Sequence, residues 1–415
     1  MEKKYFPIKT ASACQLKWSW STLYLAQSLT ASCCHAGHSP LSVENFSNFH
    51  NTDKKVNQRR LMLEGLWPDD CGYCKQHEDI GQSSYRTVSN QLTDQYPPEL
   101  DIDLTAVEVT PMILEIYFNN TCNLSCVYCV PEISSKINQE YKKFGNFVKH
   151  GVSLVPAKIT PNYAELLQET WTWLKQNSQK LKRFNVMGGE PFYQIEFDHC
   201  LNYFESTVHP DLELSITTNL IVAHDKLIEY VNKFKSLLSK QKLKSINIIC
   251  SIDCAGAEQE YVRWGIDLAL WKKNFEYLMQ QKWLTLNINQ AVSLLTIKSM
   301  PVLLEQLQEW NKIRNIGHFL TPVNNPAYLK SNLLGDFFNT DFEHILKLML
   351  TDTELQLEVK SFMSSMASEA SQSQRDIDKL LDLKIFLTEN DSRRGSDWKS
   401  TFPWLVPELE NLHVV

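Results

Sequence analysis

The sequence predicts an α/β fold in which a parallel sheet forms a partial (β/α)6 barrel of the TIM type. Two observations lead to this prediction. Six short apolar runs follow one another between about residues 108 and 330, and the longer segments between them repeat apolar residues every three or four positions. Strands that alternate with helices form parallel sheets, and right-handed crossovers favour a closed or open barrel.

The six expected strands are residues 111–118, 183–188, 212–219, 245–253, 284–293 and 317–323. The clearest helices between them are expected at 162–181 and 224–241. In such barrels the chemistry lies in the loops that follow the carboxyl ends of the strands.

The regions on either side of the barrel have a different character. Residues 1–100 carry five of the eleven cysteines and few periodic segments, and a polar bridge with two prolines connects them to the barrel at 108–330. We expect a small cysteine-rich N-terminal domain there. Residues 331–415 are expected to form a helical C-terminal extension, with 361–374 as a loop or a poorly ordered helix.

Composition narrows the class of protein. With 41 basic and 48 acidic residues the net charge is −7, without long runs of one sign, which argues against nucleic acid and anionic membranes as partners. No apolar window approaches the roughly 18 residues of a membrane span, and the start lacks a signal-peptide core. We expect a cytoplasmic protein, in which cysteines serve metal or redox chemistry more often than disulfides.

Three cysteines follow the first expected strand. Cys122, Cys126 and Cys129 have the spacing C-x3-C-x2-C, so their α-carbons lie within roughly 14 Å and 11 Å along a stretched chain. Structural zinc and ferredoxin-type loops use four ligands. An iron-sulfur cube held by three thiolates leaves one iron open to a ligand. The alternatives are three buried cysteines, or a zinc site completed from elsewhere in the chain.

The motif "CNLSCVYC", with Tyr128 before its third cysteine, resembles the signature of the radical S-adenosylmethionine (SAM) superfamily. The resemblance implies a radical SAM barrel whose 4Fe-4S cluster binds SAM. It also implies cleavage of SAM to a 5′-deoxyadenosyl radical that abstracts hydrogen from a substrate. A flavodoxin- or ferredoxin-type donor would supply the electron.

Further SAM contacts are implied by the same resemblance. "GGEP", which comprises Gly188, Gly189, Glu190 and Pro191 at the end of the second strand, resembles the motif that contacts the SAM amino group, although it also suits an ordinary strand-to-helix turn.

Residues at the ends of the third and fourth strands would reach the ribose or cap a helix: Thr218, Asn219, Ser251 and Asp253. Arg263 could pair with the SAM carboxylate or with Glu260.

The N-terminal cysteines predict a second metal site. Cys71 and Cys74 form a C-x2-C pair, and Cys14 with Cys33, or its neighbour Cys34, would complete four thiolates for zinc or a 4Fe-4S cluster. The pattern resembles the SPASM/Twitch module of radical SAM enzymes, although that module usually follows the barrel. The resemblance implies an auxiliary 4Fe-4S cluster.

The last three cysteines lie in expected strands and helices. Cys200 and Cys250 are expected in the core. Cys254 follows the fourth strand and is a candidate catalytic hydrogen donor.

The sequence therefore predicts a radical SAM enzyme of oxidoreductase type that acts on a peptide or protein by oxidation, crosslinking or epimerisation. A carbohydrate or aminocyclitol substrate is the alternative. A non-catalytic zinc-binding interaction protein is the alternative of another class.

Overall fold

The fold is described from a computed structural model, which covers residues 10–33, 35–79, 81, 84–91, 106–147 and 159–412. The chain forms two compact units. The first combines Met1–Asn119, Lys158–Ile216 and Tyr230–Asn247, and the second combines Asn120–Ala157, Thr217–Glu229 and Ile248–Val415.

The strands confirm the predicted α/β class with a mostly parallel sheet. In the part of the chain that the structure describes, nine strands follow the order β11-β10-β8-β7-β6-β4-β1-β2-β3. Their bounds are β1 Trp20–Tyr24, β2 Leu29–Ala31, β3 Ser39–Pro40, β4 Ile113–Tyr117, β6 Arg183–Met187, β7 His209–Thr218, β8 Leu243–Ser251, β10 Thr285–Val292 and β11 Gly317–Pro322. Strands occur at all six expected positions, and β1–β4, β4–β6, β6–β7 and β10–β11 pair in parallel. The (β/α)6 barrel itself stays a prediction.

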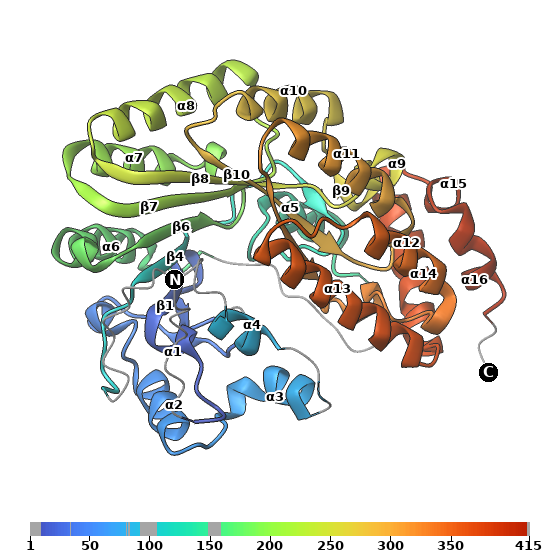
Figure 1. Ribbon diagram of the computed structural model, residues 1–415, viewed down its shortest axis with the longest axis horizontal. Helices are drawn as coiled ribbons and strands as arrows, with labels where there is room; N and C mark the ends of the chain where they lie inside the picture. The colour runs from blue at the N-terminus through green and yellow to red at the C-terminus, as the bar shows by residue number, and fades with distance from the viewer. Residues whose placement is uncertain are drawn as a thin grey trace. The chain divides into compact units, whose positions relative to one another are not determined.

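The first unit contains the N-terminal segment together with three of the expected strands. Its helices are α1 Gln15–Ser19, α2 Asp53–Leu63, α3 Gly72–Asp79, α4 Tyr85–Gln91, α6 Tyr163–Asn177, α7 Ile195–Ser206 and the second half of α8 His224–Ser239. Figure 1 shows β1 beside β4, and the register pairs Trp20 with Ile113 and Tyr24 with Tyr117. The N-terminal segment therefore extends the same sheet as β4.

The strands of the first unit are buried on both faces. On one face the side chains are apolar, as Leu114, Phe184 and Leu214 illustrate, and each is 0% exposed. Strands covered on both faces are typical of parallel sheets with crossover helices. The opposite face of these strands is polar and is described with the site.

The second unit contains the three-cysteine loop, β10, β11 and the C-terminal helices. Its helices are α5 Ser135–Phe144, the first half of α8, α9 Gly256–Val262, α10 Leu268–Met279, α11 Met300–Ile313, α12 Asn339–Leu348, α13 Glu354–Gln372, α14 Ile377–Arg394, α15 Trp398–Thr401 and α16 Val406–Glu410. A two-stranded sheet joins β5 Ser125–Cys126 to β9 Arg263–Trp264.

Segment 361–374, expected as a loop or a poorly ordered helix, lies largely within α13. This helix begins with a capping box in which Thr353 and Gln356 satisfy each other's backbone amides. In the described ranges, no helix has the length and hydropathy needed to cross a bilayer.

Candidate functional site

The three-cysteine loop follows β4 and is anchored by backbone pairing. β5 pairs antiparallel with β9 so that Cys126 lies opposite Arg263, and the amide of Val127 donates to the carbonyl of Val262 at 2.9 Å. The amide of Cys129 donates to the carbonyl of Cys126 at 3.0 Å. Cys126 and Cys129 are therefore held by main-chain contacts as well as by packing.

The first cysteine of the loop is held by the start of α5. The amide of Cys122 donates to Ser135 Oγ at 3.0 Å, and this hydroxyl contacts the carbonyl of Cys122 at 3.1 Å. Asn219 Nδ2 lies 4.0 Å from Cys122 Sγ and donates to Asn123 Oδ1 at 2.8 Å. The structure thus brings Asn219, predicted as a cofactor contact, beside the cysteine loop.

The three thiols are electrostatic neighbours. Burial raises the pKa of Cys129, and the nearby Cys126 and Cys122 raise it further. Burial also raises the pKa of Cys126, which Arg263 opposes. A metal binds thiolates, so these sites would release protons on loading. Among the residues that the structure describes, no three His, Cys, Asp or Glu side chains form a group that could hold a single metal ion.

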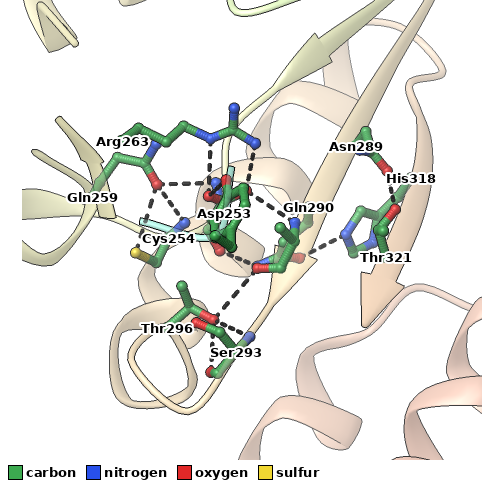
Figure 2. A network of polar contacts seen from close by, with 12 residues as sticks. Asp253, Cys254, Gln259, Arg263, Asn289, Gln290, Ser293, Thr296, His318 and Thr321 are labelled. Carbon is green, nitrogen blue, oxygen red and sulfur yellow. Dashed lines mark hydrogen bonds and ion pairs between the residues drawn. The ribbon is translucent and has the colours of Figure 1, made fainter. Parts of the chain in front are cut away.

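Arg263 and Asp253 form a buried ion pair beside the loop (Figure 2). Arg263 Nε and Nη2 donate to the two carboxylate oxygens of Asp253 at 2.9 Å and 2.8 Å. Tyr128 Oη donates to the same carboxylate at 2.5 Å. Burial raises the pKa of Tyr128 well above its ordinary value, and the charge of Asp253 raises it by a smaller amount. The pair therefore fixes the aromatic residue of the cysteine motif.

Asp253 is fully occupied by protein donors. Its Oδ1 accepts from Arg263 and from the amide of Ala291, the latter at 2.9 Å, while Oδ2 accepts from Arg263 and Tyr128. An ionised carboxylate has about four acceptor positions, so none is left for a ribose hydroxyl. The sequence left Asp253 to a ribose contact or a helix cap, and Arg263 to the SAM carboxylate or to Glu260. The structure pairs Asp253 and Arg263 with each other.

A polar chain continues from Asp253 into β10 and β11. Gln290 Nε2 donates to the carbonyl of Asp253 at 2.5 Å, and its Oε1 therefore accepts from His318 Nε2 at 2.8 Å (Figure 2). Burial lowers the pKa of His318 to about 4, so this histidine is neutral near pH 7. Sequence reasoning missed His318, because polar residues occur along both β10 and β11 and only the fold shows that this one is buried.

Cys254 lies in the core beside this network and is 0% exposed. Its amide donates to Gln259 Oε1 at 2.9 Å, and its thiol contacts the same oxygen at 3.6 Å (Figure 2). Burial raises the pKa of the thiol. A hydrogen donor must touch the substrate, and this enclosed position gives the predicted catalytic contact no support.

The remaining predicted contacts of the second unit are also largely buried. Thr218 Oγ1 accepts from the amide of Leu220 at 2.8 Å in a local turn, and Leu220 has a left-handed φ of 62°. Ser251 ends β8 and is 7% exposed. The contact of Thr218 with Leu220 does not cap the following helix, because α8 begins only at His224, so neither of the two roles expected for Thr218 is shown.

The glycine motif belongs to the first unit and follows β6. Gly188 and Gly189 have φ values of 80° and 58°, which glycine adopts readily. A Cβ on Gly188 would lie 2.2 Å from Tyr117 Cδ1, so no side chain fits at this position. Glu190 is 0% exposed and accepts from the amide of Phe192 at 3.3 Å, at the start of the short helix Pro191–Tyr193.

A buried polar row crosses the sheet of the first unit. The register places Glu115 between Thr22 and Asn185, and Asn185 opposite Ser215. Thr22 Oγ1 donates to Glu115 Oε1 at 3.1 Å, and Asn247 Nδ2 donates to Ser215 Oγ at 3.1 Å. Burial raises the pKa of Glu115 to about 7, although Thr22 and Asn185 lower it. Sequence reasoning missed this row because polar residues occupy alternate positions of several separate strands.

The N-terminal cysteines face one pocket in the first unit. Its lining includes all four predicted ligands, Cys14, Cys33, Cys71 and Cys74. Burial raises the pKa of Cys71 to about 11, with Cys33 and Cys74 among the smaller contributions. The alternative Cys34 lies outside the described residues.

A second hollow lies beside Cys129 in the second unit. Its lining includes Tyr141, Phe147, Tyr328 and Arg394. Arg394 donates through Nε and Nη2 to the carboxylate of Glu140 at 3.2 Å and 2.9 Å. Nothing in the sequence pointed to Arg394, because it ends a helix more than 250 residues after the cysteine loop.

Comparison with known proteins gives a structural likeness and no match at the level of sequence. No family model and no curated protein matches the chain. Among solved structures, the chain is similar to coproporphyrinogen III oxidase (HemN) from Escherichia coli, which is described as a radical SAM enzyme. Identity is 13% and the TM-score is 0.34, and the match covers 62% of this chain and 52% of that one. The chain thus spans about half the length of HemN, and the functional proposal depends on its own residues.

Proposed function

We propose that this protein is a radical SAM enzyme. The observation that carries the proposal is the C-x3-C-x2-C loop directly after β4, whose thiols are electrostatic neighbours and whose second cysteine is fixed by the β5–β9 pairing. Three soft thiolate ligands suit an iron-sulfur cluster.

Cys122, Cys126 and Cys129 would hold a 4Fe-4S cluster. When bound, the cluster supplies the electron that cleaves SAM to methionine and a 5′-deoxyadenosyl radical, which takes hydrogen from the substrate. Residues near the three-cysteine loop fix its position. Arg263, paired with Asp253, lies opposite Cys126 and keeps a positive charge beside that thiolate.

Other residues of the loop region orient the ligands. Tyr128 is fixed by its hydrogen bond to Asp253, and Asn219 Nδ2 is placed to donate weakly to Cys122 Sγ. Hydrogen bonds to cluster sulfurs tune reduction potentials. We assign Asp253 to positioning because protein donors fill its oxygens. For Gly188 to Pro191 we propose the contact with the SAM amino group that their motif implies.

The four N-terminal cysteines are proposed to hold an auxiliary 4Fe-4S cluster. The support is the shared pocket and the mutual electrostatic effects of Cys14, Cys33, Cys71 and Cys74. We further propose a peptide or protein substrate, on the basis of the resemblance to SPASM/Twitch modules alone, and a flavodoxin- or ferredoxin-type electron donor. A carbohydrate or aminocyclitol is the alternative substrate.

Metal analysis tests the proposal. The protein would be purified without oxygen, reconstituted with iron and sulfide, and analysed for metal content and for broad absorption near 400 nm. We expect about eight irons per chain, and about four after Cys126→Ala. Cys200→Ala is the matched control, because Cys200 is a fully buried core residue. Stoichiometric zinc without iron would support the zinc-binding interaction protein instead.

The substrate is tested by isotope transfer. Deuterium from a labelled candidate peptide or sugar should appear in 5′-deoxyadenosine when reductant and SAM are present. Cys71→Ala should still release deoxyadenosine but should form no final product. Full product formation by this variant would contradict the auxiliary cluster.

A further inference from the structure

Lys17, in the N-terminal pocket, belongs to a group of three buried basic residues that form no ion pair with a carboxylate among the described residues, although Glu108 acts on Arg59 at longer range. Lys17, Lys55 and Arg59 are at most 2% exposed. Among the described residues, their hydrogen bonds go only to neutral groups. Buried charges without a counter-ion are costly. The pocket is therefore suited to an anion.

Lys17 is the cation that lines the pocket itself. Its Nζ donates to Ser32 Oγ at 2.9 Å and to Gln58 Oε1 at 2.8 Å, so acceptors in the described segments use two of its three protons. Its charge lowers the pKa of both Cys14 and Cys71, against the larger effect of burial. Lys17 is therefore an electrostatic neighbour of two of the four cysteines.

The carboxylates near the pocket are already paired with other cations. Asp70 contacts Lys54 at 2.8 Å and accepts from Gln58 Nε2 at 2.6 Å. Glu78 is paired with Arg86, whose Nε donates to it at 2.9 Å. Each pair has little net charge, and the charge of Lys17 is the smallest of the causes that act on the lowered pKa of Asp70.

We propose that Lys17 is the charge-compensating residue of the four-cysteine centre and raises its reduction potential. Four thiolates outweigh the charge of the core that they bind, so the assembly is an anion that a buried ammonium stabilises. Reduction adds one further negative charge, taken from an external low-potential donor, and a fixed cation favours that reduced form. The inference rests on the auxiliary centre proposed above.

The experiment isolates this centre in the full-length chain. Changing Cys122, Cys126 and Cys129 to Ala leaves only the N-terminal site, and about four irons per chain are then expected after reconstitution. Lys17→Gln would be introduced in this background and compared with Lys75→Gln. Lys75 lies on α3 near Cys74, but its side chain is 43% exposed and paired with Asp79, so solvent screens its charge.

The readout is an anaerobic redox titration followed by electron paramagnetic resonance. Lys17→Gln should lower the ratio of reduced to oxidised cluster at a fixed potential at least tenfold, which is 59 mV for a one-electron couple. Lys75→Gln should leave this ratio within twofold. Equal ratios in the two variants would overturn the proposal.

Other outcomes are also decisive. Loss of iron from a Lys17→Gln protein whose circular dichroism is unchanged supports the proposal, because the anion is then no longer balanced. If Lys17→Gln does not fold, Lys17→Met takes its place, with a potential shift in the same direction expected and no shift as the contrary result. If the isolated site takes zinc and no iron, the auxiliary cluster is wrong. The role of Lys17 is then tested by chelator competition. The Lys17→Gln variant is expected to bind zinc at least tenfold more weakly than the Lys75→Gln variant.

Discussion

Replacing Asp253 with asparagine removes one negative charge from the centre of the polar network without changing the size of the side chain. Asp253 is 0% exposed and its partner Arg263 has a side-chain exposure of 8%. The variant would leave the guanidinium buried without its counter-ion. It would also disturb the contacts of the carboxylate with Tyr128 and Ala291.

Asp253→Asn is expected to lower the free energy of unfolding by a large amount. Removing one partner of a buried ion pair costs about 3–5 kcal/mol, against a total stability of about 5–15 kcal/mol for a typical domain. Tyr128→Phe removes one hydrogen bond to the same carboxylate and keeps the ion pair, so it should cost less, about 1.5–3 kcal/mol. The double variant Asp253→Asn/Arg263→Gln should recover part of the loss, because no buried charge remains.

Unfolding of the metal-free protein in guanidinium chloride measures the loss of unfolding free energy. Hydrogen exchange of residues 118–134 shows whether the cysteine loop becomes less protected. Faster exchange in this segment is expected for Asp253→Asn, since Arg263 lies opposite Cys126 in the β5–β9 pair. A loss below about 1 kcal/mol, with unchanged exchange, would refute the assignment of Asp253 as the residue that holds the loop.

Three further predictions concern single residues. Gly188→Ala should destabilise the protein more than Gly65→Ala: both glycines have a φ of 80°, which costs about 1–2 kcal/mol with a side chain, but only Gly188 would also clash with Tyr117. Equal losses in thermal unfolding would contradict the clash. The pKa of Glu115 is raised from 4.5 to about 7, so the cost of burying its carboxylate grows as pH rises from about 4.5 and is complete above 7. Glu115→Gln should therefore gain about 3 kcal/mol in unfolding free energy between pH 4.5 and pH 8 relative to the wild type, and a gain independent of pH would contradict this. Burial lowers the pKa of His318 to about 4. The unfolded chain therefore takes up a proton on this histidine at a higher pH than the folded chain, and the free energy of unfolding falls as pH drops from 7 to 4. His318→Gln should remove about 3 kcal/mol of that fall, and an unchanged pH dependence of unfolding would show that His318 is not its source.

The sequence allowed the α/β class and the positions of six strands to be predicted, because buried parallel strands are continuous apolar runs such as "PMILEIYF". It did not predict β1. The segment Trp20–Tyr24 mixes serine and threonine with apolar residues, and its partner β4 lies about 90 residues later in the chain. Pairing between such distant segments leaves no local signal. The predicted boundary near residue 100 stays a prediction, and the contact-based unit that contains the N-terminal segment also contains β4, β6 and most of β7.

The cysteine positions were the most predictable part of the site, because thiol spacing is visible along the chain. The interactions of Asp253 and Arg263 were not, since a carboxylate after a strand looks the same whether it faces a ligand or an arginine. Lys17 and His318 were missed for a related reason. Their burial results from packing between distant segments, and only the folded chain brings their partners into contact.

The central claim is that this chain cleaves SAM reductively with the help of Cys122, Cys126 and Cys129. The most direct test is mass-spectrometric detection of 5′-deoxyadenosine after the reconstituted protein is mixed with SAM and a strong reductant. We predict its release by the wild type and by Cys200→Ala, and none by Cys126→Ala. No release by an iron-loaded wild type, or equal release by Cys126→Ala, would contradict the claim.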